Sequence, residues 1–226
     1  KVIKDALVLG TDNNFGHDYV NAFEARFQLK TRNAVTTGWD ELDALTKGGL
    51  GAGELGVVVA PTGAGKSMVL THLGTQAVKA GKTVIHYTLE LAESAIGNRY
   101  DSCLTGVPLG DLYQLKELVY ETVQDIEGTL IIKEYPTKSA STRTLSTHLE
   151  KLRKRDINPD MIIVDYGDLL RPVMYQKEKR NELESIYEEL RGIAQEHKCP
   201  LWTASQTNRS GLNAEVITME SISEAF

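Results

Sequence analysis

The chain has 226 residues, of which 41% are apolar, and a formal net charge of −6 at neutral pH. This length and composition fit one α/β domain, and no apolar run approaches the ~18 residues of a membrane-spanning helix, which argues against a membrane protein. The acidic balance argues against a protein that coats nucleic acid through general positive charge, while a few basic loops can still grip a single strand.

Residues 1–34 are predicted to form an N-terminal segment that precedes a domain spanning residues 35–226. In this segment, apolar residues recur at helical spacing over His17–Thr31, which predicts a helix. This helix belongs either to the core of the domain or to a linker that packs its apolar stripe on a neighbouring subunit. The pattern leaves both interpretations open.

A phosphate-binding loop directly follows the apolar run Val57–Val59, in the order of strand, Gly-rich turn and helix that such loops require. The turn directs its backbone N–H groups at the phosphates, and the N-terminus of the next helix adds partial positive charge. Lys66 can reach the β- and γ-phosphates, and the Ser67 hydroxyl is placed to ligate Mg²⁺. Glycines keep the two positions of closest approach, and Ala60 in place of the usual first glycine is a mild change. We therefore expect ATP and Mg²⁺ to bind at Ala60, Pro61, Thr62, Gly63, Ala64, Gly65, Lys66 and Ser67.

Downstream of this loop, short apolar runs rich in β-branched residues alternate with segments of helical periodicity. The runs predicted as strands are Val84–Leu89, Leu130–Ile132, Met161–Val164 and Leu201–Ala204. The segments predicted as helices are Met68–Ala80, Ser94–Leu104, Leu112–Gln124, Leu145–Lys154 and Glu182–His197. This alternation predicts an α/β fold with a mostly parallel central sheet flanked by helices, which binds ligands beyond the carboxyl ends of its strands.

Acidic residues follow two of the predicted strands. Asp165 ends the third run, where a carboxylate can hold a water of the Mg²⁺ shell opposite the phosphate loop. The next residue is Tyr166 and not Glu, so the base that orients the attacking water has to come from another strand. Glu90 is the best candidate, because its strand is expected to lie beside the strand of the phosphate loop, as sequential elements usually do. Asp168 is a weaker candidate, and an acid that merely complements a helix dipole is the structural alternative for Glu90.

A polar segment, Ser205-Gln206-Thr207-Asn208-Arg209, follows the last predicted strand. A neutral amide at Gln206 can hydrogen-bond the γ-phosphate or the attacking water and report hydrolysis to adjacent loops. A glutamine that only satisfies a loop carbonyl is the alternative, and the sequence does not decide between them.

Together these motifs resemble the RecA-like ATPases, and among them the DnaB-type replicative DNA helicases, especially their phage versions. The resemblance extends over Thr37–Phe226 and rests on the phosphate loop and on Thr37–Asp43, Gly48–Leu55, Thr88–Leu91, Val164–Tyr166 and Ser205–Arg209. It implies a RecA-like P-loop NTPase fold in which Glu90 is the catalytic base, Lys66 binds the phosphates, Asp165 is the Mg²⁺ partner and Gln206 is the sensor. It also implies a hexameric ring that hydrolyses ATP at subunit interfaces, moves on single-stranded DNA in replication, and has primase or other replisome proteins as partners.

Two parts of the family pattern are not found in this sequence. The trans-acting arginine finger and the last strands lie beyond the sensor motif in the family, so we expect them C-terminal to Phe226. The primase-binding N-terminal domain is also absent from these residues. We therefore expect a motor core that lacks some of its working parts.

The resemblance places the DNA-contacting loop after Asp165. The basic residues expected to neutralise phosphates of one strand there are Arg171, Lys177, Lys179 and Arg180. A solvated charged loop is the alternative. A second basic run, Lys151–Arg155, is expected instead to complement the carbonyl end of a helix.

Two other function classes stay open, a RecA- or RadA-type recombinase and a KaiC-like regulatory ATPase without DNA contacts. KaiC-like sequences commonly carry two adjacent glutamates at the catalytic strand end, whereas Leu91 follows Glu90 here. Recombinases usually lack the Asp-Tyr and Ser-Gln-x-Asn-Arg motifs in this form, so both comparisons favour the helicase. The isolated cysteines Cys103 and Cys199, without a secretory signal, favour a cytoplasmic protein.

Overall fold

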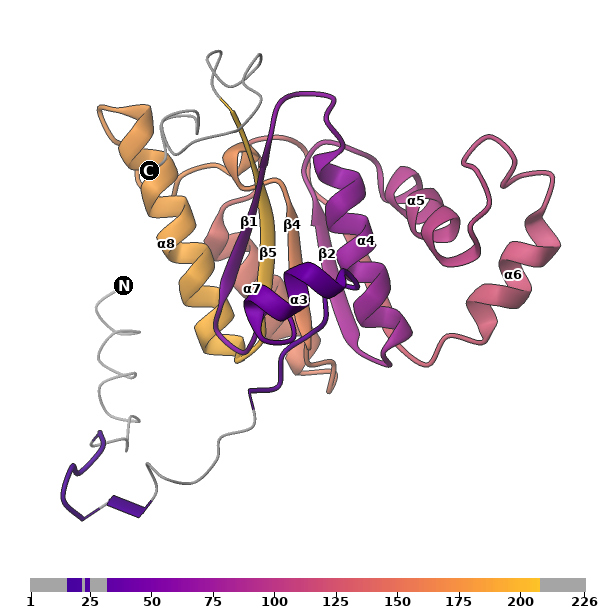
Figure 1. Cartoon of the computed structure of the whole chain (residues 1–226). Coiled ribbons are helices and arrows are strands. Elements are labelled where there is room, and N and C mark those ends of the chain that lie inside the picture. Colours follow the sequence, from indigo (N-terminus) through magenta and orange to yellow (C-terminus); the bar gives the residue numbers. More distant parts are fainter. Residues whose placement is uncertain (1–15, 22, 25–31, 208–226) are drawn as a thin grey trace. The chain divides into compact units, whose positions relative to one another are not determined.

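Figure 1 shows the computed structural model of the chain, which describes residues 16–21, 23–24 and 32–207. The chain divides into two units, Lys1–Arg32 and Asn33–Phe226. The helices and strands labelled in Figure 1 all belong to the second unit. The domain boundary expected after residue 34 stays a prediction.

The first unit contains a short polar turn within its described residues. The Asp18 carboxylate accepts hydrogen bonds from the backbone N–H groups of Val20 and Asn21, at 3.1 and 3.0 Å. Most of the helix predicted over His17–Thr31 lies outside the described residues. Its assignment as core helix or linker helix therefore stays a prediction.

The second unit is built on a five-stranded parallel sheet with the strand order β1-β5-β4-β2-β3. The strands are β1 (Leu55–Ala60), β2 (Thr83–Thr88), β3 (Thr129–Glu134), β4 (Met161–Asp165) and β5 (Leu201–Gln206). All strands predicted after the phosphate loop are confirmed, with small shifts at their ends. The parallel α/β fold is confirmed with them.

Helices cover both faces of this sheet, with α4 and α5 on one face and α7 and α8 on the other (Figure 1). The helical elements are α3 (Asp40–Thr46), α4 (Lys66–Lys79), α5 (Glu93–Thr105), α6 (Lys116–Gln124), α7 (Thr142–Arg153), the 3₁₀ helix η1 (Gly167–Leu169) and α8 (Lys179–His197). Every predicted helix after the phosphate loop is present. The helix expected from Leu112 begins later, at Lys116, because turns occupy the preceding residues, and α8 begins before the expected Glu182.

The expectation that β2 lies beside β1 is wrong, because β5 and β4 lie between them. The chain leaves β1 through α4, passes the positions that the two later strands fill, and forms β2 at the far side of β4. Neighbours in sequence are often neighbours in a sheet, but here the long-range pairings of the later strands decide the order. The chain thus runs outward from β1 to β2 and β3, and then returns to form β4 and β5 between β1 and β2. Open α/β sheets bind ligands where the strand order reverses in this way.

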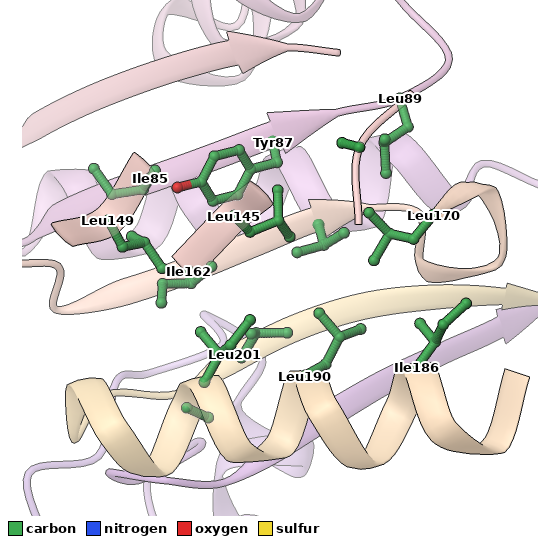
Figure 2. Packing of buried hydrophobic residues seen from close by; sticks show 14 of the residues in the cluster. Ile85, Tyr87, Leu89, Leu145, Leu149, Ile162, Leu170, Ile186, Leu190 and Leu201 are labelled. Atoms are coloured by element: carbon green, nitrogen blue, oxygen red, sulfur yellow. The ribbon is translucent and has the colours of Figure 1, made fainter. Parts of the chain in front are cut away.

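Alternate residues of β4 pack into two hydrophobic cores, one on each face of the sheet. Ile162 joins the core under α7 and α8, and Figure 2 shows Leu149 of α7 and Leu190 of α8 directed toward the same core. Ile163 joins the other core, under α4. Both isoleucines are 0% exposed. Burial on both faces explains the uninterrupted apolar run in β4, and it fixes the strand that carries Asp165.

A short helix that no pattern predicted, α3, directly follows residues 37–39, which contact His72 of α4. The Asp43 carboxylate accepts hydrogen bonds from the backbone N–H and the hydroxyl of Thr37, both at 2.8 Å. Trp39 stacks on His72 of α4, with ring centroids 4.2 Å apart. No residue of α3 is buried, so its sequence lacks the apolar periodicity that reveals longer helices.

Candidate nucleotide-binding site

The residues singled out by the sequence motifs converge at the carboxyl-terminal edge of the sheet. A cavity of about 310 Å³ opens there, between the phosphate loop, the segment after β2 and the ends of β4 and β5. Its lining includes Lys66, Ser67, Glu90, Tyr166 and Gln206. Four segments that are far apart in the sequence therefore build one site.

The phosphate loop holds two glycines in a backbone conformation that other residues rarely adopt. Gly63 and Gly65 have φ angles of +77° and +92°. A Cβ placed at either position would meet no heavy atom within 4 Å, so the protein leaves open space in front of both. That space is the cradle that a phosphate group needs. Ala60 is the last residue of β1 and pairs with Gln206, a strand position that does not require glycine.

Lys66 is the first residue of α4, and its ammonium lies over the loop. Nζ donates hydrogen bonds to the carbonyl oxygens of Ala60 and Pro61, at 3.3 and 3.1 Å, and lies 5.6 Å from the centre of the Tyr166 ring. No carboxylate of the described residues forms an ion pair with Lys66. Its charge is therefore available to an anionic ligand in the cavity.

Asp165 ends β4 as a fully buried carboxylate, and neither of its oxygens has a hydrogen-bond partner among the described residues. Burial raises the pKa of Asp165, as does the charge of Glu90, while the neighbouring Ser67 hydroxyl acts in the opposite direction. Buried oxygens without partners are costly unless a cation or its water shell satisfies them. A carboxylate beside a hydroxyl is an oxygen donor set that suits Mg²⁺.

Glu90 emerges next to Asp165 because β2 and β4 are paired. Thr88 lies opposite Asp165 in the register, and the N–H of Leu89 donates to the carbonyl of Asp165 at 2.9 Å. Glu90 follows directly and lines the cavity with an exposed side chain. Glu93 is the acidic residue in the first turn of α5, where it complements the helix N-terminus. The role of Glu90 as the base stays a prediction.

Gln206 is the last residue of β5, and its side chain contacts the phosphate loop directly. Its Nε2 donates a hydrogen bond to the hydroxyl of Thr62. Its backbone N–H donates to the carboxylate of Asp168 at 3.3 Å. The amide is thus directed at the cavity, where the sensor role requires it, and its partner is not the loop carbonyl of the structural alternative.

Arg99 is a second cation of the site, and no sequence motif indicated it. This half-buried residue of α5 lines the cavity together with Lys66, and its charge helps to lower the pKa of Asp165 against the effect of burial. Buried Ile96 and Tyr100 mark the inward side of α5. In the sequence, the signal for Arg99 is a cation close to these inward positions on the helix that follows Glu90.

Asp168, the weaker candidate for the base, does not line this cavity within the described structure. Its carboxylate accepts hydrogen bonds from the hydroxyls of Tyr187 and Ser205, at 2.5 and 3.3 Å, and from the backbone N–H of Gln206. These donors occupy the oxygens that a general base would need to keep free. The geometry therefore favours Glu90.

One of the four expected DNA-contacting residues, Arg171, lies at a basic hollow. The hollow has a volume of about 450 Å³, and Arg171 shares it with Arg143 and Lys151 of α7. No acidic side chain lines it within the described structure. Lys151 also lies in the last turn of α7, which confirms the expected placement of the second basic run at a helix end.

The other three expected contacts divide between a loop and a helix. Lys177 lies in the irregular segment before α8, as expected. Lys179 and Arg180 are the first residues of α8 and do not belong to the loop, which corrects the expectation. Because a helix N-terminus carries partial positive charge, these two cations do not stabilise α8.

Two kinds of feature are absent from the part of the chain that the structure describes. Among these residues, no helix has the length and apolar character to cross a bilayer. They also contain no group of three or more His, Cys, Asp and Glu side chains that could hold a metal ion.

Comparison with known sequences identifies the family. The model of the DnaB-like helicase C terminal domain matches residues 34–215. The DnaB-like replicative helicase of Enterobacteria phage T4 is 29% identical over 239 residues, which cover 99% of this chain and 50% of that protein. The replicative DNA helicase DnaB of Leifsonia xyli subsp. xyli is 28% identical over 180 residues, 77% of this chain and 39% of that protein. The chain thus spans about half the length of the phage relative, and less of the bacterial one.

Solved structures show the same fold. A DnaB-like replicative helicase, reported with its interactions with primase, superimposes with a TM-score of 0.76 at 15% identity, covering 100% of this chain and 58% of that one. A second solved structure, of an ATPase domain, gives a TM-score of 0.73 at 15% identity, covering 99% of this chain and 78% of that one. These likenesses confirm the RecA-like fold. Since the family match extends over most of the chain and every motif of the site, the chain belongs to the DnaB-like helicase C-terminal domain family.

Proposed function

We propose that this chain is the ATP-hydrolysing motor domain of a replicative DNA helicase, which couples hydrolysis at subunit interfaces to movement on single-stranded DNA and to duplex unwinding. The observation that carries the proposal is the convergence of Lys66, Ser67, Glu90 and Gln206 on one cavity, with Asp165 at the end of the adjoining strand. The family match favours the helicase over the recombinase and the KaiC-like alternatives.

The side chains of the cavity divide the work of hydrolysis. The loop N–H groups and Lys66 bind the β- and γ-phosphates, and Glu90 takes a proton from the attacking water. As the water oxygen bonds to the γ-phosphorus, the bond to the bridging oxygen breaks and its electron pair stays on ADP. Gln206 orients the water or contacts the γ-phosphate. Arg99 adds positive charge from the same subunit.

Mg²⁺ fits the same site. Ser67 would bind the ion through its hydroxyl, and Asp165 would bind it through water, which satisfies its two partnerless oxygens. When bound, Mg²⁺ neutralises charge on the β- and γ-phosphate oxygens. Glu90 and Lys66 are left free for the water and the phosphates.

The complete protein is proposed to form a hexameric ring. Large apolar side chains are exposed on and before α6, including Tyr113 at 91%, Tyr120 at 61% and Leu118 at 48%. Exposed apolar clusters of this kind are typical of surfaces that meet another subunit. An arginine finger from the neighbouring subunit would supply the remaining cation, an effect worth about 10³–10⁵ in rate.

The DNA strand is proposed to run past the basic hollow and past the irregular segment that leads from Arg171 to α8. Arg143, Lys151 and Arg171 all have exposed side chains there, on a chain whose net charge is negative. Lys177, Lys179 and Arg180 extend this positive charge toward the start of α8. Local cations can bind phosphates of one strand without a generally basic protein.

Partners and location follow from the same assignment. A related helicase has been reported with its interactions with primase, so primase is proposed as a partner of the complete protein. A cytoplasmic location is proposed because replication takes place there in bacteria and their phages. Cys103 and Cys199 are both free thiols, which suits that compartment.

The test uses the complete protein and the variant Glu90→Gln, with Glu188→Gln on the exposed surface of α8 as the control. Glu90→Gln should bind Mg²⁺–ATP normally and lose turnover by at least about 10²-fold, because a general base contributes that much. The wild-type rate per subunit should rise with protein concentration and again with single-stranded DNA. Near-normal turnover by Glu90→Gln would place the base elsewhere. A rate per subunit that stays unchanged down to concentrations at which the protein is monomeric would exclude catalysis at subunit interfaces.

A further inference from the structure

A polar network beside the cavity joins the end of β5 to the segment that follows β4. At its centre is Asp168 of η1, whose Oδ2 accepts hydrogen bonds from the backbone N–H of Gln206 and the hydroxyl of Ser205, both at 3.3 Å. Its Oδ1 accepts the hydroxyl of Tyr187 at 2.5 Å. One carboxylate therefore ties the end of β5 to α8.

Lys138 holds the same segment from the other side. Its Nζ donates hydrogen bonds to the carbonyl oxygens of Asp168 and Leu170, both at 2.8 Å. The segment Gly167–Leu170 is thus clamped between the end of β5 and the loop before α7. Arg171, the first of the proposed DNA contacts, is the next residue.

The network requires an ionised carboxylate at its centre. Burial, followed by the charge of Asp168, raises the pKa of Tyr187, so this side chain remains a phenol that donates its proton. All three partners of the carboxylate are donors, and a carboxylate accepts from all of them. A carboxamide in its place would present its own N–H groups to at least one donor.

We propose that Asp168 is a positioning residue, which links the nucleotide contact of Gln206 to the DNA contacts that begin at Arg171. The inference rests on the proposed function. Asp168 binds the backbone of the residue whose side chain contacts Thr62 of the phosphate loop. When a γ-phosphate replaces Thr62 as the partner of Gln206, the backbone N–H bonded to Asp168 shifts, and the clamped segment carries the shift to Arg171.

The variant Asp168→Asn tests this coupling in the complete protein. Glu188→Gln is the matched control, because it removes the same charge from an exposed position of α8. ATPase assays with and without a saturating dT oligonucleotide give kcat, KM and the factor by which DNA stimulates turnover. In Asp168→Asn the KM for ATP should stay within about twofold of the wild type, whereas the stimulation factor should fall about two- to tenfold, the effect of losing one or two hydrogen bonds. Tyr187→Phe should show a smaller loss, and Glu188→Gln none.

Two results with Asp168→Asn would overturn the proposal, and one result with the wild type would instead refute the proposed function. Unchanged DNA stimulation in Asp168→Asn would overturn it. A loss of turnover as deep as that of Glu90→Gln, equal with and without DNA, would also overturn it and make Asp168 a catalytic group. If the wild type itself shows no DNA stimulation, the proposed function fails. The link to Gln206 is then judged by the ratio of ATPγS affinity to ADP affinity, which should fall in Asp168→Asn. An unchanged ratio would reject the link.

Discussion

The basic hollow beside the segment after β4 offers a quantitative test of DNA binding. Arg143→Gln combined with Arg171→Gln removes two of its three cations. The two residues come from different elements and both have exposed side chains, so the double substitution should leave the fold intact. If both arginines contact phosphates, the double variant binds single-stranded DNA more weakly and with a weaker dependence on salt.

The expected size follows from the release of counterions. Each phosphate contact on a single strand contributes about −0.7 to the slope of log K against log salt concentration, so the magnitude of the slope should fall by about 1.4. Between about 50 and 200 mM salt, the affinity advantage of the wild type over the double variant should then shrink about sevenfold.

Fluorescence anisotropy of a labelled dT oligonucleotide, titrated with the complete protein and ATPγS at several salt concentrations, measures these slopes. Lys154→Gln combined with Arg155→Gln is the matched control, because it removes the same charge from exposed positions just beyond α7. Equal slopes for the wild type and the Arg143/Arg171 variant would refute the reasoning. So would an equal loss in the control, which would indicate only an effect of net charge.

Two further predictions concern binding and stability. Lys66→Ala should keep the fold and abolish tight ATP binding in an equilibrium titration. The reason is that no other described residue places an ammonium over the loop. Unchanged ATP affinity in the folded variant would refute the assignment of the phosphate loop. His86 is fully buried in β2, and burial, followed by the charge of Arg99, lowers its pKa from 6.5 to about 3. At a pH below 6.5, His86 binds a proton in the unfolded chain but stays neutral in the folded chain. The free energy of unfolding therefore decreases as the pH falls. Urea unfolding should show a loss of about 1.2 kcal/mol from this residue between about pH 7 and pH 5.5. His86→Gln should lack that part of the loss, and an equal loss in the variant would contradict the assignment.

Local features of the site were predictable because short stretches of sequence encode them. The glycines at positions 63 and 65 report a backbone conformation, and the apolar run before Asp165 reports a strand buried on both faces. Each of these two patterns is contained in a few consecutive residues, so it can be recognised without knowledge of distant contacts. The phosphate loop, the strands and the identity of Glu90 as a residue of the cavity could therefore be predicted.

Features decided by distant contacts could not be predicted in the same way. The position of β2 in the sheet depends on where β4 and β5 pair, and the sequence of β2 does not indicate those pairings. Arg99 reaches the cavity only because α5 packs against α4. The start of α8 at Lys179 contradicts the local charge preference of a helix N-terminus.

The strand order also determines when this site can form during synthesis on the ribosome. β5 is the last of the described strands to be made, yet it lies between β1 and β4 and is the only described strand that pairs with β1. Until Leu201–Gln206 has emerged, β1 and the phosphate loop have no place in the sheet. A nascent chain stalled before β5 would therefore contain the complete phosphate-loop sequence and still be unable to hold ATP. ATP binding, measured on stalled chains of increasing length, would then show the chain length at which β5 takes its place between β1 and β4.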